Sequence, residues 1–260
     1  LGLKIIVNTD GFEWKRGKWN KLAKLFLLIS DYLAINFSEL VICDSPVIQE
    51  RVNSISSAKT IYIPYGADHV LRGPIESSPI LSNLEILDKE YFFSVCRIEP
   101  ENSIHLFVEA AKISKEKLVI VGNWNNSKYG IYIKEKYSKE KNIFLLNPIY
   151  EQNQLASLRA NCRSYIHGHT VGGTSPSLVE PMWMGLDIIC INNKFTRYTT
   201  ADQATYFNDV DELAEIMKKK ISGNDKSSNG EKMKKLAESR YTHKKVCNCY
   251  LSAVNEVFGR

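Results

Sequence analysis

Short apolar runs alternate with amphipathic stretches along nearly the whole chain, and this alternation constrains the fold more than any other feature. Most of the runs are continuously apolar, as at residues 40–43 and 118–121. Strands of this kind are buried on both faces, which is the pattern of parallel sheets covered by helices. The sequence therefore predicts an α/β protein. We expect strands at residues 3–7, 40–43, 60–63, 91–95, 118–121, 143–146, 164–166 and 187–191, and helices at 18–37, 46–53, 103–114, 129–139, 152–161, 177–184, 210–220 and 231–258.

The strand–helix series is interrupted once, near residue 80. Residues 69–89 are rich in Gly, Pro and Ser and contain no clear regular element. Three expected strands precede this stretch, too few for a complete doubly wound domain, and five follow it. We therefore expect a partial Rossmann-like domain over residues 1–80, a complete one over 81–242, and a C-terminal helix over 243–260 that packs back toward the first domain.

The composition is that of a soluble globular protein, with 44% hydrophobic and 24% charged residues. The longest apolar run, residues 25–29, is too short to cross a bilayer. Six cysteines are scattered, mostly in or beside apolar runs, which favours buried thiols over a disulfide framework and hence a cytoplasmic protein. The net charge of +5 is not accompanied by a recognised nucleic-acid-binding module, so we expect no nucleic acid partner.

A basic, aromatic segment at residues 14–24 allows two interpretations. The helix expected there carries apolar side chains at helical spacing, namely Trp19, Leu22, Phe26, Ile29 and Leu33. Such a stripe predicts a buried face, with the lysines of the segment in solvent. In the second interpretation the lysines form a basic rim that meets anionic lipid headgroups or a pyrophosphate-bearing acceptor, as a peripheral contact at the inner face of the cell membrane.

Residues 171–185 predict an anion-binding site. Two glycines follow an apolar strand and a His-Gly-His-Thr loop, and Ser175 with Pro176 then opens a helix, because Ser is a favoured N-cap and Pro suits the first helical position. Backbone N–H groups and the partial positive charge of a helix start bind phosphate. Glu180 lies about one turn further in, where its carboxylate can accept hydrogen bonds from both hydroxyls of a ribose. Phosphate donors beside a diol acceptor predict a nucleotide-sugar site. The alternative for this segment taken alone is an ordinary strand–loop–helix corner with a solvated Glu180.

Several stretches together resemble the retaining glycosyltransferases of family 4, and in particular the bacterial rhamnosyltransferase-like branch of polysaccharide synthesis. They are NTDGFEWKRGKW (8–19), ICDS (42–45), IPYGAD (63–68), SVCRIEPEN (94–102), IVGNW (120–124), YIHGHTVGGTSPSLVEPMWMG (165–185) and FTRYTTADQATYF (195–207). The resemblance implies the GT-B fold, with two Rossmann-like doubly wound parallel-sheet domains. It also implies that the first domain is truncated at its N-terminus, because the match begins inside that domain of the relatives.

The resemblance implies a donor site residue by residue. Arg97 matches the arginine that grips the donor diphosphate, a role that suits a permanently charged, bidentate guanidinium. Glu180 matches the ribose-binding second glutamate of the family's Glu-x7-Glu motif. Gly122 begins the loop after the second strand of this domain, and Asn147 lies where the nucleobase docks. The backbone cradle for the distal phosphate and the sugar comprises Gly172, Gly173, Thr174 and Ser175.

The chain departs from the family pattern at three positions. Gly172 stands where the first glutamate of the motif belongs, Asn102 replaces a lysine, and Asp10 replaces a histidine. We interpret these changes as traits of the rhamnosyltransferase-like branch. They leave the catalytic residues less defined than the donor site. Our candidates are Asp10 and Glu101, whose carboxylates would stabilise an oxocarbenium-like sugar, and His169, which either contacts the sugar or only supports its loop.

The implied activity is transfer of a hexose to a saccharide acceptor, which the resemblance suggests is lipid-linked. The first choice of donor is dTDP-rhamnose, which would supply L-rhamnose, and UDP-hexoses come next. The sugar would keep its configuration, and we expect neither a metal nor another cofactor because Arg97, the helix start and backbone donors neutralise the leaving diphosphate. Two alternatives remain open, a nucleotide-sugar 2-epimerase of the same fold and a donor-binding fragment without activity.

Overall fold

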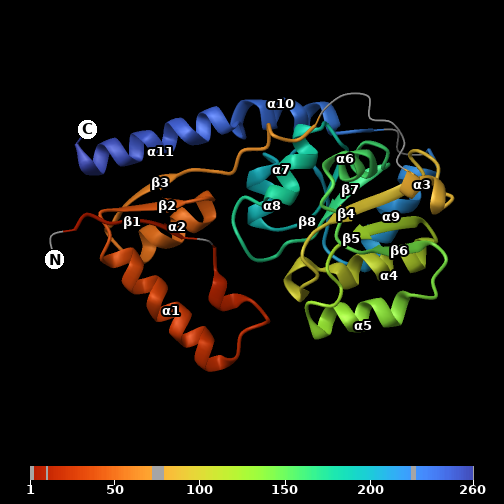
Figure 1. Cartoon of the computed structure of the whole chain (residues 1–260), viewed down its shortest axis with the longest axis horizontal. Helices are drawn as coiled ribbons and strands as arrows, with labels where there is room; N and C mark the ends of the chain where they lie inside the picture. Colours follow the sequence, from red (N-terminus) through yellow and green to blue (C-terminus); the bar gives the residue numbers. More distant parts are fainter. Residues whose placement is uncertain (1–2, 10, 72–78, 224–226, 260) are drawn as a thin grey trace.

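The structure, a computed structural model, contains two parallel sheets with helices packed around them (Figure 1). This architecture confirms the expected α/β class and the two Rossmann-like units. The described residues are 3–9, 11–71, 79–223 and 227–259.

The first sheet has three parallel strands in the order β1-β2-β3, with bounds Ile6–Thr9, Leu40–Cys43 and Lys59–Tyr62. The helices α1 (Lys21–Asn36) and α2 (Pro46–Ile55) connect them. All four residues of β2 are buried, as its unbroken apolar sequence predicts for the central strand of a parallel sheet.

The second sheet has six parallel strands in the order β6-β5-β4-β7-β8-β9. One of its faces packs against α4, α5 and α9, and the other packs against α6, α7 and α10. Both faces are therefore covered, as the continuous apolar runs predict. The strands are β4 (Tyr91–Val95), β5 (Lys117–Val121), β6 (Ile143–Leu146), β7 (Ser164–His167), β8 (Ile188–Ile191) and β9 (Thr205–Phe207). The helices are α3 (Pro79–Asn83), α4 (Ile104–Ser114), α5 (Lys128–Tyr137), α6 (Gln152–Ala160), α7 (Pro176–Trp183), α8 (Lys194–Thr199), α9 (Val210–Ile221), α10 (Gly230–Arg240) and α11 (His243–Phe258), with short helices η1 (Glu13–Lys15) and η2 (Pro100–Asn102).

The last helix, α11, runs from the second domain back across the first sheet (Figure 1). Its Ala253 and Val257 pack in one apolar cluster with Leu40 and Ile42 of β2. The chain thus crosses between the domains twice, once before residue 91 and once at α11, and the second crossing covers a face of the first sheet.

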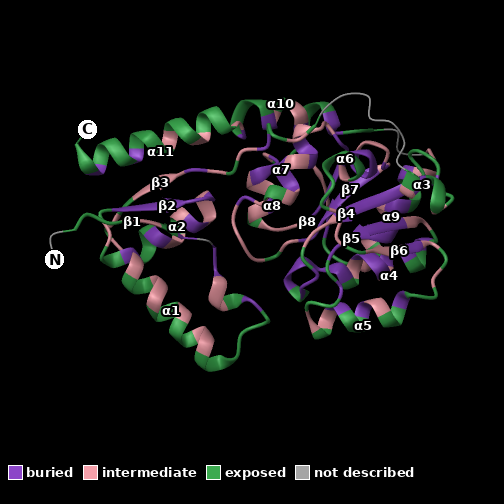
Figure 2. Cartoon of the chain, in the orientation of Figure 1, coloured by how far each residue is buried: buried purple, intermediate pink, exposed green. Residues whose placement is uncertain are grey.

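The expected burial of the α1 stripe is wrong. Leu22 is 79% exposed, Phe26 is 70% exposed, and Ile35 is the buried residue of this helix. Figure 2 shows α1 as largely exposed, at the edge of the first domain. The periodicity correctly indicated a helix but assumed a neighbour that would cover its apolar face. Within the described ranges, no helix combines the length and apolar character needed to span a bilayer.

Several elements differ from the sequence-based expectation. Residues 69–89 were expected to contain no regular element, but α3 spans Pro79–Asn83 within them. The helix expected over residues 231–258 is two helices, because Tyr241 leaves the helical conformation and buries its ring, donating its hydroxyl to the Thr199 carbonyl at 2.9 Å. The strand β9 and the helix α8 were not expected. Both are short, three and six residues, so neither carries enough of a repeating pattern to be recognised.

Candidate functional site

The carboxyl ends of strands from both sheets converge on one cavity of about 380 Å³. The first domain contributes Asp44 after β2 and Tyr65 after β3, and the second contributes Arg97 after β4 and the loop after β7. Ligands of doubly wound sheets bind at this end of the strands. The cavity is lined by most of the residues predicted for the donor site and by one predicted catalytic residue, namely Arg97, Gly172, Gly173, Thr174, Ser175 and His169.

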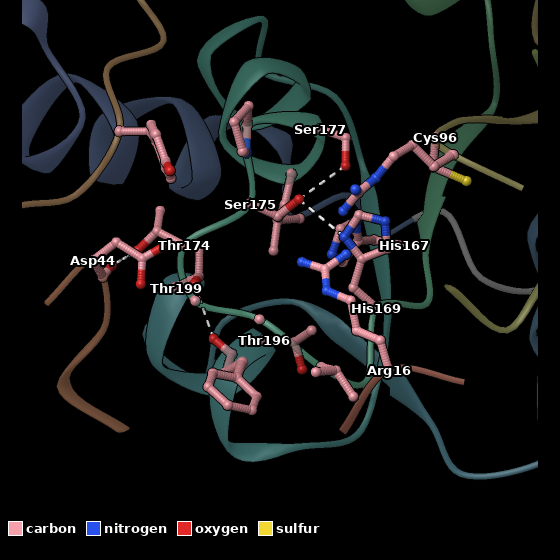
Figure 3. A pocket seen from close by; sticks show the side chains of 18 residues that line it. Arg16, Asp44, Cys96, His167, His169, Thr174, Ser175, Ser177, Thr196 and Thr199 are labelled. Atoms are coloured by element: carbon pink, nitrogen blue, oxygen red, sulfur yellow. Dashed lines mark hydrogen bonds between the residues drawn. The ribbon is translucent and has the colours of Figure 1, made fainter. Parts of the chain in front are cut away.

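The loop after β7 and the start of α7 form one side of the cavity (Figure 3). Ser175 is the N-cap of α7 and Pro176 follows in the first turn, as the sequence predicts. The Ser175 hydroxyl does not bond to the backbone of the helix. It bonds instead to His169 Nδ1 and to Ser177 Oγ, each at 3.0 Å. The first N–H groups of the helix therefore remain donors that an anion can use.

Gly172 has a φ of +137°, a conformation that L-residues rarely adopt. The family's first glutamate belongs at this position, and a glutamate would be strained in this backbone. The replacement of that glutamate by glycine thus agrees with the local conformation. It also means that the first carboxylate of the family motif is missing at this point of the cradle.

Arg97 directly follows Cys96, just beyond the end of β4, and lines the cavity together with the cradle. Its carbonyl oxygen accepts a hydrogen bond from the side-chain amide of Asn102 at 2.7 Å. Asn102 is buried in η2, so the residue that replaces the family's lysine fixes the backbone of Arg97 and does not line the cavity. The family's second cation at that position is accordingly absent.

Two histidines lie beside the cradle, with ring centroids 4.2 Å apart. Burial, together with the positive charges of Arg97 and Arg16, lowers the pKa of His169 to about 3. Burial, together with the neighbouring His169, lowers the pKa of His167 well below 6.5. Both rings are therefore neutral at physiological pH. The buried Nε2 of His169 has no hydrogen-bond partner among the described residues, which leaves it for a ligand.

The two domains touch at the cradle itself. The Thr174 hydroxyl donates to the carbonyl oxygen of Asp44 in a short hydrogen bond. A Cβ atom on Gly173 would overlap the Asp44 carboxylate, and one on Gly11 would lie 3.0 Å from the Cα of Gly172. Glycine is thus required where the two backbones meet. An apolar contact reinforces the interface, because the rings of Phe12 and Phe195 lie 5.8 Å apart.

Glu180 lies beside the main cavity, in a neighbouring hollow of about 360 Å³. The two spaces share Asp44, Tyr65 and Pro176 in their walls, so they adjoin one another. The Glu180 carboxylate forms a short ion pair with the buried Arg159, and its Oε1 lies 3.5 Å from His69 Nε2. Glu180 is therefore held in a fixed position one turn into α7, at the side of the glycine cradle.

Three of the remaining predicted residues lie among the described residues and do not line the cavity. Glu101 is buried in η2 with its Oε1 3.9 Å from Arg16 Nη1. Gly122 is packed against the loop after β4, where no Cβ would fit, and Asn147 follows β6. Asp10 lies outside the described residues. The functional roles of these four residues remain predictions.

Sequence reasoning missed several residues that line the cavity, namely Arg16, Asp44, Tyr65, Phe195, Thr196 and Thr199. All of them lie within the stretches that carried the family resemblance, which was the available signal. Their contribution requires the two domains to come together, which spacing along the chain does not reveal. Among the described residues, no group of three or more His, Cys, Asp or Glu side chains could hold a metal ion.

The chain matches two family models. The model of glycosyl transferases, group 1, matches residues 81–242, and a domain of unknown function, DUF1972, matches residues 1–68. No curated protein matches the chain.

Solved glycosyltransferase structures share the fold at low sequence identity. Sucrose-phosphate synthase of Thermosynechococcus elongatus is 14% identical with a TM-score of 0.80, covering 98% of this chain and 68% of that chain. HepE of Anabaena in complex with UDP-glucose is 14% identical with a TM-score of 0.75, covering 97% and 72%. The pneumococcal O-GlcNAc transferase GtfA in complex with UDP and GlcNAc is 14% identical with a TM-score of 0.66, covering 99% and 53%. The fold is GT-B, and the chain belongs to the group 1 glycosyl transferases.

Proposed function

We propose that this chain binds a nucleotide-sugar donor and transfers its hexose, with retention of configuration and without a metal, to a saccharide acceptor. The observation that carries the proposal is the meeting of Arg97, the start of α7 and the glycine cradle in one cavity. Two anion-binding elements, a guanidinium and a helix start, face the same space. HepE was solved with UDP-glucose and GtfA with UDP and GlcNAc, and these complexes support the same class of donor here.

The finer assignment follows the sequence resemblance. We place the chain in family 4, in the rhamnosyltransferase-like branch that serves cell-surface polysaccharide synthesis. The first choice of donor is dTDP-rhamnose, and UDP-hexoses come next. On this assignment Glu180 accepts hydrogen bonds from the ribose hydroxyls through the oxygen that Arg159 does not bind. Gly122 and Asn147 then lie toward the nucleobase.

Transfer on one face of the sugar accounts for retention without an enzymic nucleophile. The acceptor hydroxyl oxygen bonds to the anomeric carbon while the bond from that carbon to the leaving phosphate oxygen breaks. The acceptor's proton passes to that phosphate oxygen. Negative charge grows on the diphosphate during this step, and Arg97 and the N–H groups at the start of α7 stabilise it.

His169 contributes to binding the sugar in this proposal. A ring with a pKa of about 3 is neutral at physiological pH and is a weak general base, so it does not take the acceptor's proton. Its Nε2 instead hydrogen-bonds a sugar hydroxyl. Asp10 and Glu101 remain our candidates for stabilising the oxocarbenium-like sugar.

Thermal-shift measurements with dTDP-, UDP- and GDP-sugars test the donor site, since a ligand that binds the native state raises its stability. We expect one nucleotide class to raise the melting temperature and the others to do so less. Product analysis by NMR with an added saccharide then tests retention, and activity in excess EDTA tests metal independence. Turnover of the donor sugar into its C2 epimer without an acceptor would favour the epimerase alternative. Binding without turnover would favour the inactive fragment.

We also propose that α1 contacts the cytoplasmic face of a membrane that carries the acceptor. Its exposed apolar side chains include Leu22 and Phe26, and the lysines at positions 15, 18, 21 and 24 lie at its N-terminal end. Apolar area beside positive charge suits anionic lipid headgroups. Sedimentation with phosphatidylglycerol vesicles should retain the chain, and the double substitution Leu22→Ser/Phe26→Ser should release it. Equal binding to neutral phosphatidylcholine vesicles would show that the lysines do not contribute by binding anionic headgroups.

A further inference from the structure

A second arginine reaches the donor cavity from the first domain. Arg16 ends the short helix η1 and is 7% exposed. Figure 3 places its side chain beside His169 in the wall of the cavity. Among the described residues that line the cavity, Arg16 and Arg97 are the cationic ones, since His169 is neutral. The sequence placed Arg16 in a stretch that carries the resemblance but gave it no role at the donor site.

The cavity needs a second cation for the chemistry assigned to it. A leaving nucleoside diphosphate carries at least two negative charges, and the family pattern provides both an arginine and a lysine to neutralise them. In this chain the position of the lysine is Asn102, whose amide is bound to the Arg97 carbonyl. We propose that Arg16 binds the donor diphosphate across the domain interface, in the role of the missing lysine. This inference rests on the proposed function.

The surroundings of Arg16 hold it in position before the donor arrives. Its Nε forms a short ion pair with Glu13 in the same turn, and its Nη1 lies 3.9 Å from Glu101 Oε1 in the second domain. Gly17 also lies beside the second domain, since a Cβ atom built on it would lie 3.9 Å from the side chain of Pro100. A guanidinium has five N–H donors, so one that is paired on one side can still bind phosphate oxygens on the other.

The electrostatics support the convergence of the two arginines. The positive charges of both Arg97 and Arg16 act to lower the pKa of His169. Both arginines also line the same cavity, one from each domain. Like charges in one cavity repel one another, and the carboxylates of Glu13 and Glu101 offset part of the charge of Arg16. A diphosphate between Arg16 and Arg97 adds negative charge on the cavity side and draws the two domains together.

A purely structural role for Arg16 makes a different prediction. If Arg16 served only to bridge the domains through Glu101, then Arg16→Gln and Glu101→Gln would have the same effect on ligand binding. If Arg16 binds phosphate, Glu101→Gln removes a competitor for its guanidinium, and diphosphate binding stays equal or becomes tighter. The two substitutions therefore separate the roles. Lys21→Gln is the matched control, since it removes one positive charge from an exposed position of the same segment.

The experiment is isothermal titration of the full chain with dTDP, UDP and GDP and with the corresponding monophosphates. Loss of one charge-assisted contact should weaken binding of the diphosphate by about ten- to a hundredfold in Arg16→Gln. Binding of the monophosphate should weaken less, because a monophosphate carries less negative charge for two arginines to neutralise. Lys21→Gln should bind like the wild type, and Arg16→Lys, which keeps the charge, should recover part of the loss. Melting curves of each variant check that it is folded.

Two results would overturn the inference. Diphosphate binding by Arg16→Gln at wild-type affinity would show that the guanidinium does not contact phosphate. Parallel losses in Arg16→Gln and Glu101→Gln, equal for mono- and diphosphates, would assign Arg16 to the domain bridge. Failure of the wild type to bind any of the nucleotides is a separate result, because it would refute the proposed function as well.

Discussion

The contact between Gly173 and Asp44 predicts a specific loss of stability when a side chain is added at position 173. A Cβ atom at position 173 would lie well inside 3.0 Å of the Asp44 carboxylate, closer than real Cβ atoms approach other atoms. Asp44 is buried, and its carboxylate would have to move away from the added methyl group. Overpacking of this kind costs about 1–3 kcal/mol. Gly173→Ala should therefore destabilise the protein by about 1–3 kcal/mol, or lower its melting temperature by roughly 2–12 °C.

A double-mutant cycle isolates this contact. Urea denaturation of the wild type, Gly173→Ala, Asp44→Ala and the double variant gives the coupling free energy of the pair. Since Asp44→Ala keeps the carbonyl oxygen that Thr174 binds, it removes the overlap and leaves the backbone contact in place. We expect the double variant to be more stable than the sum of the single effects by at least about 1 kcal/mol. A coupling near zero would show that the two residues do not meet, and the described domain interface would be wrong.

Three further predictions concern stability. The pKa of His167 is near 6.5 in the unfolded chain and well below that value in the folded protein. The free energy of unfolding should therefore fall by up to about 1.4 kcal/mol per pH unit below pH 6.5. His167→Gln should reduce this pH dependence in denaturation measured from about pH 7 to about pH 5, and an unchanged slope would contradict the lowered pKa. Arg159→Ala should cost about 3–5 kcal/mol by leaving Glu180 without its buried partner, and a loss below about 1 kcal/mol would show that the pair is solvated. Phe26→Ala should change the free energy of unfolding by less than about 0.5 kcal/mol, because Phe26 is exposed, and Ile35→Ala should lower it by about 2–5 kcal/mol, because Ile35 is buried. A larger loss for Phe26→Ala than for Ile35→Ala would show that the apolar stripe of α1 is buried after all.

Local sequence patterns determined most of the fold correctly. Continuous apolar runs predicted the central strands β2 and β4 at their observed bounds, because burial on both faces leaves no polar positions. The N-cap at Ser175 was also predicted correctly, because Ser followed by Pro favours a helix start wherever it occurs in the chain. Such features depend on neighbours in sequence. They do not depend on how the domains are arranged.

Features that depend on the arrangement of distant segments could not be predicted from the sequence. The stripe of α1 indicated a helix, but exposure of Phe26 depends on whether another element covers it. Arg16 resembled a member of a solvated basic cluster, and its burial follows from contact with η2 of the other domain. Likewise the sequence showed that Asn102 replaces the family lysine, which we interpreted as a branch trait, but it did not show which other cation serves the site. The structure places another cation in the same cavity, from a segment far away in the sequence.

The most direct test of the account is an experimental structure of the chain with a bound nucleoside diphosphate, dTDP or UDP. We expect phosphate oxygens to lie within hydrogen-bond distance of the Arg97 guanidinium and of the backbone N–H groups at the start of α7. The ribose should be directed toward Glu180. A diphosphate bound elsewhere, or a nucleotide that leaves Arg97 and the cradle without contact, would contradict it.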